Sequence, residues 1–182
     1  MNFVRGINGS KSGDMDALAS SVANLGREVF IIEYPVTRWW EAWSRQLQFD
    51  VAEVIVDATQ DGQDIAGHSF GCLGIHRAME KGRIFNHVTY LGPAMNRDFR
   101  FPDGKAARVD VFYNPMDKAV LAGKMIPFHD IGDMGVSGSD WEHIDPRVHN
   151  HASPHHRRGT NNHGFYIHGD ELQEYAQFIA HG

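Results

Sequence analysis

The chain has 182 residues, of which 42% are hydrophobic and 22% charged, a balance that suits one globular domain with a sizeable core. The net charge of −6 argues against nucleic acid as a partner, and the single cysteine excludes an intrachain disulfide. Because we find no apolar stretch of membrane-spanning length and no secretory signal pattern, we expect a cytoplasmic protein without a membrane span.

Short apolar runs that predict strands alternate along the chain with stretches of helical periodicity. Strands are predicted at 3–4, 29–32, 65–66, 88–91 and 109–113, and helices at 15–22, 40–54, 70–82, 118–123 and 172–179. Ser12 or Asp14, Thr37 and Asp170 are candidate helix caps. The continuous apolar run at 29–32 predicts a strand that is covered on both faces.

The alternation predicts one α/β domain over residues 1–182, with a mostly parallel central sheet and helices on both faces. Residues 125–128 predict a weak strand, which Pro127 places at a sheet edge. Residues 130–162 show no sustained period and predict a long irregular loop, which we expect to form one wall of the substrate pocket.

The segment Gly67-His68-Ser69-Phe70-Gly71 has the pattern G-x-S-x-G between a predicted strand and a predicted helix. That order predicts a nucleophile elbow, a strained turn that lifts the serine hydroxyl above the sheet. Within it, we expect His68 to pack or to line the pocket. The first N–H groups of the following helix point to where an oxyanion would form.

A serine nucleophile needs a histidine base, and the base needs an acid that orients it. Asp117 is the best acid candidate, because it follows the second strand after the elbow. Its alternative role is the N-cap of the helix that begins at Lys118. Asp98 and Asp103 are weaker alternatives, and Asp110 lies inside a strand, from which it would not reach the loops.

The base is harder to choose, because nine of the 12 histidines follow Asp117 and eight of them are candidates. His163 is favoured, since it lies in a loop just before the last helix, and His168 is the next candidate. The remaining candidates after the acid are His129, His143, His149, His151, His155 and His156.

An oxyanion hole needs two N–H donors. Phe70, directly after the serine, is expected to supply one of them. The second is expected from the loop after the first strand, where either Ile7 or Asn8 is suitably placed; Asn8 would otherwise line the pocket.

The histidines at 149, 151, 155 and 156 raise the alternative of a metal site. No cysteine or carboxylate pattern completes such a site, so a solvated polar loop is the better interpretation. We therefore predict neither a metal nor a cofactor.

Together these features resemble the α/β-hydrolase family, and in particular its small lipase- and cutinase-like esterases without a cap domain. The resemblance implies Ser69 as nucleophile, Asp117 as acid, His163 as base, and the N–H groups of Ile7 and Phe70 as the oxyanion hole. Many family members carry His-Gly after the first strand, whereas this chain has Arg5-Gly6.

The resemblance further implies a serine hydrolase that acts on a small-molecule ester or thioester. An acyltransferase that uses the same site and a non-catalytic binding protein of the same fold are the alternatives. The sequence leaves the oligomeric state open.

Overall fold

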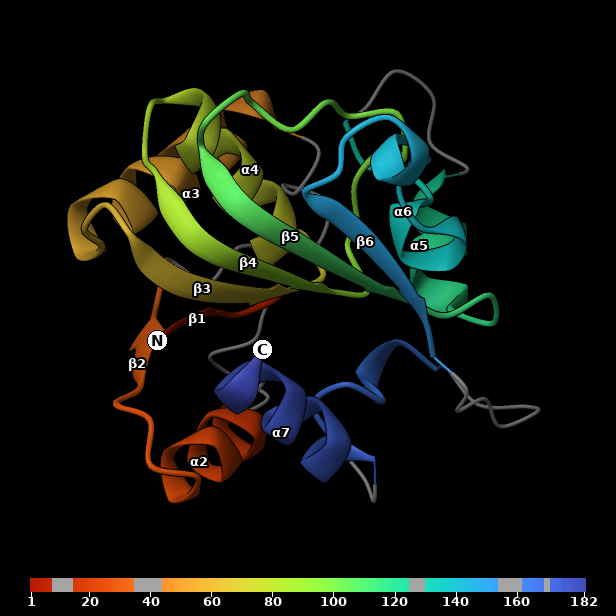
Figure 1. Cartoon of the computed structure of the whole chain (residues 1–182). Coiled ribbons are helices and arrows are strands. Elements are labelled where there is room, and N and C mark those ends of the chain that lie inside the picture. Colours follow the sequence, from red (N-terminus) through yellow and green to blue (C-terminus); the bar gives the residue numbers. More distant parts are fainter. Residues whose placement is uncertain (8–14, 35–43, 125–129, 154–161, 169–170) are drawn as a thin grey trace.

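The computed structural model describes residues 1–7, 15–34, 44–124, 130–153, 162–168 and 171–182. Six parallel strands form one sheet in the order β2-β1-β3-β4-β5-β6 (Figure 1). Their bounds are β1 Asn2–Val4, β2 Phe30–Ile32, β3 Gln63–His68, β4 Phe85–Leu91, β5 Ala106–Tyr113 and β6 Val148–Ala152.

The longer helices cover both faces of the sheet. In Figure 1, α3 and α4 lie on one face and α2 and α7 on the other. Their bounds are α2 Asp16–Asn24, α3 Arg45–Ala58, α4 Phe70–Glu80 and α7 Leu172–His181, and the shorter helices are α5 Lys118–Lys124, α6 Met134–Ser137, η2 Asp140–His143 and η3 Asn162–Gly164. This three-layer arrangement confirms the predicted α/β fold with a parallel sheet.

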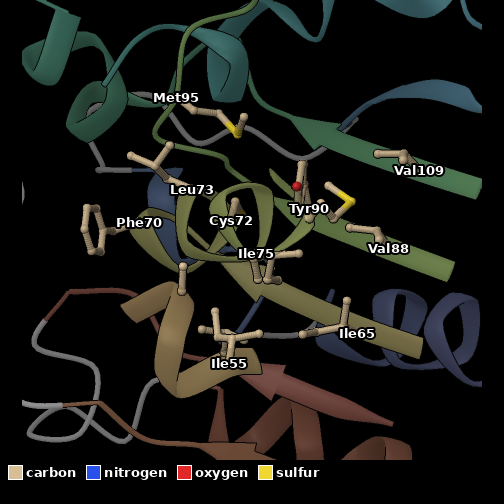
Figure 2. Close-up of a cluster of buried hydrophobic side chains, with 14 of the residues drawn as sticks. Ile55, Ile65, Phe70, Cys72, Leu73, Ile75, Val88, Tyr90, Met95 and Val109 are labelled. Carbon is tan, nitrogen blue, oxygen red and sulfur yellow. The ribbon is translucent and has the colours of Figure 1, made fainter. Parts of the chain in front are cut away.

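Side chains fill both sides of the central strands. In β3, Ile65 belongs to the cluster under α3 and α4, whereas Ala66 belongs to the cluster under α2 and α7. Figure 2 shows the first cluster, which includes Ile55 of α3, Ile75 of α4 and Val88 of β4. Each fully buried aliphatic side chain contributes about 1.5–3 kcal/mol to folding, which explains why these strands read as continuous apolar runs.

The strand predicted at residues 29–32 is present, but the prediction that both of its faces are covered was wrong. β2 is the first strand of the sheet, so it pairs with β1 alone, and Phe30 is 52% exposed. The helix predicted from residue 40 is found as α3, which begins at Arg45. Four of the cap candidates lie outside the described residues, namely Ser12, Asp14, Thr37 and Asp170, and so do residues 40–43 and the strand predicted at 125–128.

The prediction of an irregular segment over residues 130–162 was wrong, because this segment contains α6, η2 and the edge strand β6. The sequence Val-His-Asn-His-Ala of β6 has no apolar run, since polar contacts partly replace apolar ones. The His151 ring donates a hydrogen bond of 2.6 Å to Asp110 of β5, which is completely buried.

The order of the strands creates a switch point between β1 and β3, because β2 and β4 lie on opposite sides of this pair. In open α/β sheets, ligands bind beyond the carboxyl ends of the strands at such a point. Ile7 follows the end of β1 there, and Ser69 follows the end of β3. Within the described residues, we find no helix with the length and apolar character that a membrane span requires.

Candidate active site

Ser69 occupies the turn between β3 and α4 in a backbone conformation that non-glycine residues rarely adopt. Its φ is 55° and its ψ is −121°, and it is 8% exposed. Such a residue is strained by roughly 1–3 kcal/mol, which the surrounding structure must offset. The conformation is the one that the G-x-S-x-G pattern predicts for a nucleophile elbow.

The glycines of the motif are required by close approaches on both sides of the turn. A Cβ atom on Gly67 would lie 2.7 Å from the Ile75 side chain and 3.0 Å from the Cys72 nitrogen. A Cβ atom on Gly71 would meet the backbone of Val4 and Arg5. The two glycines therefore let α4 approach both β3 and β1.

The end of β4 and the loop after it hold the elbow in place through backbone hydrogen bonds. The Ser69 N–H donates to the Leu91 carbonyl at 3.0 Å, and the Ser69 carbonyl accepts from the Ala94 N–H at 3.2 Å. These bonds fix the peptide groups on both sides of the serine side chain.

Asp117 and His163 form a short hydrogen bond, although 46 residues separate them. Nδ1 of His163 donates to Oδ2 of Asp117 at 2.6 Å. The other oxygen, Oδ1, accepts from the Val120 N–H at 3.0 Å, so Asp117 also caps α5. Both roles considered for Asp117 thus involve real contacts, one with each oxygen of a side chain that is 0% exposed.

His68 contacts the same histidine from the side of the elbow. Its Nε2 donates to the main-chain carbonyl of His163 at 3.0 Å, and the two ring centroids lie 4.6 Å apart. Because His68 directly precedes Ser69, this contact brings the candidate base to the end of the strand that carries the candidate nucleophile.

Gly92, just after β4, was not singled out from the sequence and lies against the acid and the base. Its φ is +54°, and a Cβ atom there would lie 3.4 Å from Oδ2 of Asp117 and 3.5 Å from Nδ1 of His163. The Tyr166 ring would lie at 3.0 Å. The Gly-Pro pair after a strand was the only sequence signal, and such pairs mark turns in general.

Tyr166 is completely buried beside Gly92, which also lies against Asp117 and His163. Burial, with smaller contributions from Tyr175 and Asp117, raises the pKa of Tyr166 well above its ordinary value. Its hydroxyl therefore stays in the neutral, protonated form.

Two candidate oxyanion donors lie on the described backbone. Phe70 is the first residue of α4, so its N–H belongs to the first helical turn, where amides have no partner within the helix. Ile7 follows β1 and is half-buried against the core. Asn8, the alternative donor and pocket-lining candidate, lies outside the described residues.

The Arg5 carbonyl, two residues before Ile7, is fixed by a buried tyrosine. The Tyr34 hydroxyl donates to it at 2.9 Å, and the Tyr34 ring packs against Phe70 with a centroid separation of 6.4 Å. One side chain thus touches both segments that carry the candidate donors.

The weaker candidates for the acid and the base make other contacts or are exposed. Asp103 pairs with Arg100 on the surface, Asp98 accepts a bond from Trp141 through its carbonyl, and His168 is exposed. Asp110 lies inside β5, as predicted. Among the described residues, no group of three or more histidine, cysteine or acidic side chains is arranged to hold a metal ion.

The chain is similar to a solved structure from Xanthomonas campestris pv. campestris, a protein assigned to the alpha/beta superfamily of hydrolases. The TM-score is 0.50 at 15% sequence identity, and the match covers 98% of this chain and 94% of that chain. Likeness at this identity shows the fold alone, a three-layer fold similar to that of the α/β hydrolases. No family model and no curated protein matches the chain.

Proposed function

We propose that the chain is a serine hydrolase that cleaves carboxylic esters or thioesters through an acyl-enzyme on Ser69. The observation that carries the proposal is the 2.6 Å hydrogen bond between His163 and Asp117, formed beyond the same edge of the sheet as the strained serine. A histidine oriented by a buried carboxylate is what a serine hydroxyl needs in order to react at neutral pH.

In the first half of the reaction, Asp117 accepts a hydrogen bond from Nδ1–H of His163 and so favours the tautomer in which Nε2 carries no proton. Oγ of Ser69 attacks the acyl carbon and gives its proton to Nε2. The bond from the acyl carbon to the leaving oxygen or sulfur then breaks. The imidazolium of His163 returns the proton to the leaving alcohol or thiol.

In the second half, water attacks the acyl carbon and gives a proton to Nε2 of His163. The bond between the acyl carbon and Oγ breaks, and Ser69 regains its proton. In both halves the carbonyl oxygen becomes negatively charged. The N–H groups of Phe70 and Ile7 are proposed to stabilise that charge, aided by the N-terminal end of α4.

A fluorophosphonate probe tests the proposal, since it reacts with activated serines. We expect labelling of the native chain, no labelling of Ser69→Ala and strongly reduced labelling of His163→Ala. Cys72→Ser is the control, because Cys72 is a buried nucleophile on α4, and its loss should leave the labelling unchanged. Full labelling of Ser69→Ala would refute the proposal.

Product analysis separates hydrolysis from acyl transfer at the same site. With p-nitrophenyl esters of increasing chain length and an acyl thioester, the free acid is expected as the main product, even when an alcohol acceptor is added. Mainly transferred product would assign the acyl-enzyme to an acyltransferase instead.

We also propose that the segment around α6 forms one wall of the acyl pocket. This is supported by its attachment to the loop beside the elbow. The Gly135 N–H donates to the Pro93 carbonyl at 2.9 Å, and the Met134 N–H donates to the Met95 carbonyl at 3.0 Å. Replacing residues 134–137 by a flexible linker should change the preferred acyl chain length, and an unchanged preference would contradict this role.

A further inference from the structure

His68 has no part in the acyl-transfer steps above, yet it is almost completely buried, at 4% exposure, between the elbow and the candidate base. A carbonyl oxygen only accepts hydrogen bonds. The 3.0 Å contact with the carbonyl of His163 therefore requires a proton on Nε2 of His68. This contact joins residues that are 95 positions apart in the chain.

The contact acts on a part of His163 that Asp117 does not hold. Asp117 binds the imidazole through Nδ1, whereas His68 binds the main chain of the same residue. The element that carries His163 is η3, a single short turn. A turn of this length depends on tertiary contacts for its position.

A further contact joins η3 to the segment that carries Asp117. Nδ2 of Asn162 donates to the Met116 carbonyl at 3.3 Å, so the start of η3 is tied to the residue before Asp117. The contact from His68 thus ties η3 to the strand of the nucleophile, while the contacts of Asn162 and His163 tie it to Met116 and Asp117.

We propose that His68 is a positioning residue whose Nε2–H holds the main chain of His163 and so keeps the base in register with Ser69. This inference rests on the proposed hydrolase function. The donated proton is the essential feature, and the ring supplies packing against the His163 imidazole. A displacement of about 1 Å at a catalytic group is enough to lower a rate by about 100-fold.

Two variants separate the donor from the ring. His68→Phe keeps an aromatic ring but cannot donate, whereas His68→Gln has an N–H group at nearly the position of Nε2 but no ring. We expect kcat for a p-nitrophenyl ester to fall about 10- to 100-fold in His68→Phe, with KM changing less than about 3-fold. In His68→Gln, kcat should stay within about 5-fold of the native value.

His76→Phe is the matched control for the loss of a buried histidine. His76 is 1% exposed and stacks on Phe99 at 5.2 Å, on the core side of α4. Its replacement should leave kcat unchanged. Equal losses in His68→Phe and His68→Gln, or no loss in His68→Phe, would overturn the proposal.

A proton NMR measurement tests the positioning without any reaction. The Nδ1 proton between His163 and Asp117 should give a far-downfield resonance that persists in His68→Gln and broadens through faster exchange with water in His68→Phe. An equally sharp resonance in both variants would contradict the positioning role, even if the chain proved to have no hydrolase activity. Absent labelling of the native chain by the fluorophosphonate would instead refute the proposed function.

Discussion

The carbonyl oxygen of Arg5 lies 2.5 Å from the point that a Cβ atom on Gly71 would occupy, and the Val4 carbonyl lies 2.7 Å from it. Gly71→Ala must therefore move α4 away from β1. Since both obstacles are backbone atoms, we expect a loss of about 2 kcal/mol or more in the free energy of unfolding and a large fall in kcat. Urea unfolding and ester hydrolysis would measure the two effects.

Gly74→Ala is the control on the same helix. There the Cβ atom would meet the side chain of Val51 at 2.6 Å, which can adjust, and alanine gains about 1 kcal/mol of helix propensity. A smaller loss of stability with kcat retained is expected. Equal effects in Gly71→Ala and Gly74→Ala would show that the approach to β1 is unimportant.

Asp117→Asn should lower kcat by about 10⁴-fold, because an amide no longer fixes the Nδ1 proton of His163. The comparison variant is Asp110→Asn. Asp110 is equally buried and also accepts hydrogen bonds from histidines, but lies inside the sheet. Steady-state kinetics should show that Asp110→Asn keeps kcat at a temperature where it remains folded, whereas similar kcat values in the two variants would argue against Asp117 as the acid.

Asp110 should make folding sensitive to acid. Burial disfavours its ionised form, but hydrogen bonds from His151, His87 and Arg108 outweigh that cost and hold its pKa well below the ordinary value. Because the pKa is lower in the folded chain, this stabilisation is fully present above the unfolded value of about 3.9 and is lost as the pH falls below it. Unfolding free energies measured from pH 7 down to pH 2 should decline over that lower range.

The same titration in Asp110→Asn provides the contrast. At neutral pH this variant should be less stable than the native chain by about 3 kcal/mol, because Arg108 and the ring N–H groups of His87 and His151 lose the carboxylate that they bind. Because the variant lacks about one titrating carboxyl group, its free energy of unfolding should fall less between pH 4 and 2. Parallel curves of unfolding free energy against pH for the two proteins would show that Asp110 does not control the loss of stability at low pH.

Gly92→Ala should impair the Asp117–His163 pair directly. The added methyl group would be strained by the positive φ and would crowd the Tyr166 ring, Asp117 and His163. We expect kcat to fall at least about 10-fold, with weaker fluorophosphonate labelling. Gly104→Ala also changes a glycine with positive φ, but it has open space around the added Cβ atom, so it should lose stability without losing kcat.

Tyr34→Phe should loosen the loop after β1 by removing the donor to the Arg5 carbonyl. A fall in kcat of about 5- to 10-fold is expected, equivalent to the net value of roughly one hydrogen bond. Tyr90→Phe is the control, since among the described residues the buried Tyr90 hydroxyl has no hydrogen-bond partner. That variant should be as stable as the native chain or more so, with kcat unchanged; equal kinetics in the two variants would rule out a special role for Tyr34.

The sequence predicted the central strands and the elbow well, because buried parallel strands read as apolar runs and a strained serine needs small neighbours at fixed spacing. β6 was not predicted, because part of the energy that holds it against β5 comes from the contact between His151 and Asp110 rather than from apolar side chains. The apolar run that includes Phe30 led to the wrong prediction that β2 is covered on both faces, because such a run alone does not distinguish an edge strand from a central one.

Asp117 and His163 were predicted as acid and base from chain order and context, and the structure places these two side chains in hydrogen-bonding contact. The roles of Gly92 and His68 could not have been read from the chain. Both depend on atoms of His163, which lies 71 and 95 positions further along the sequence (163 − 92 and 163 − 68). Only the fold brings such residues together.

The late position of His163 has a consequence for biosynthesis. Ser69 and Asp117 leave the ribosome well before the residue proposed as the base, and η3 reaches its place only by closing loops over much of the chain. A nascent chain that ends near residue 153 would thus carry an elbow and an acid but no oriented imidazole. The proposed hydrolytic activity should therefore appear only once residues 162–181 have been synthesised, and in cotranslational assays it would report that η3 has reached its place.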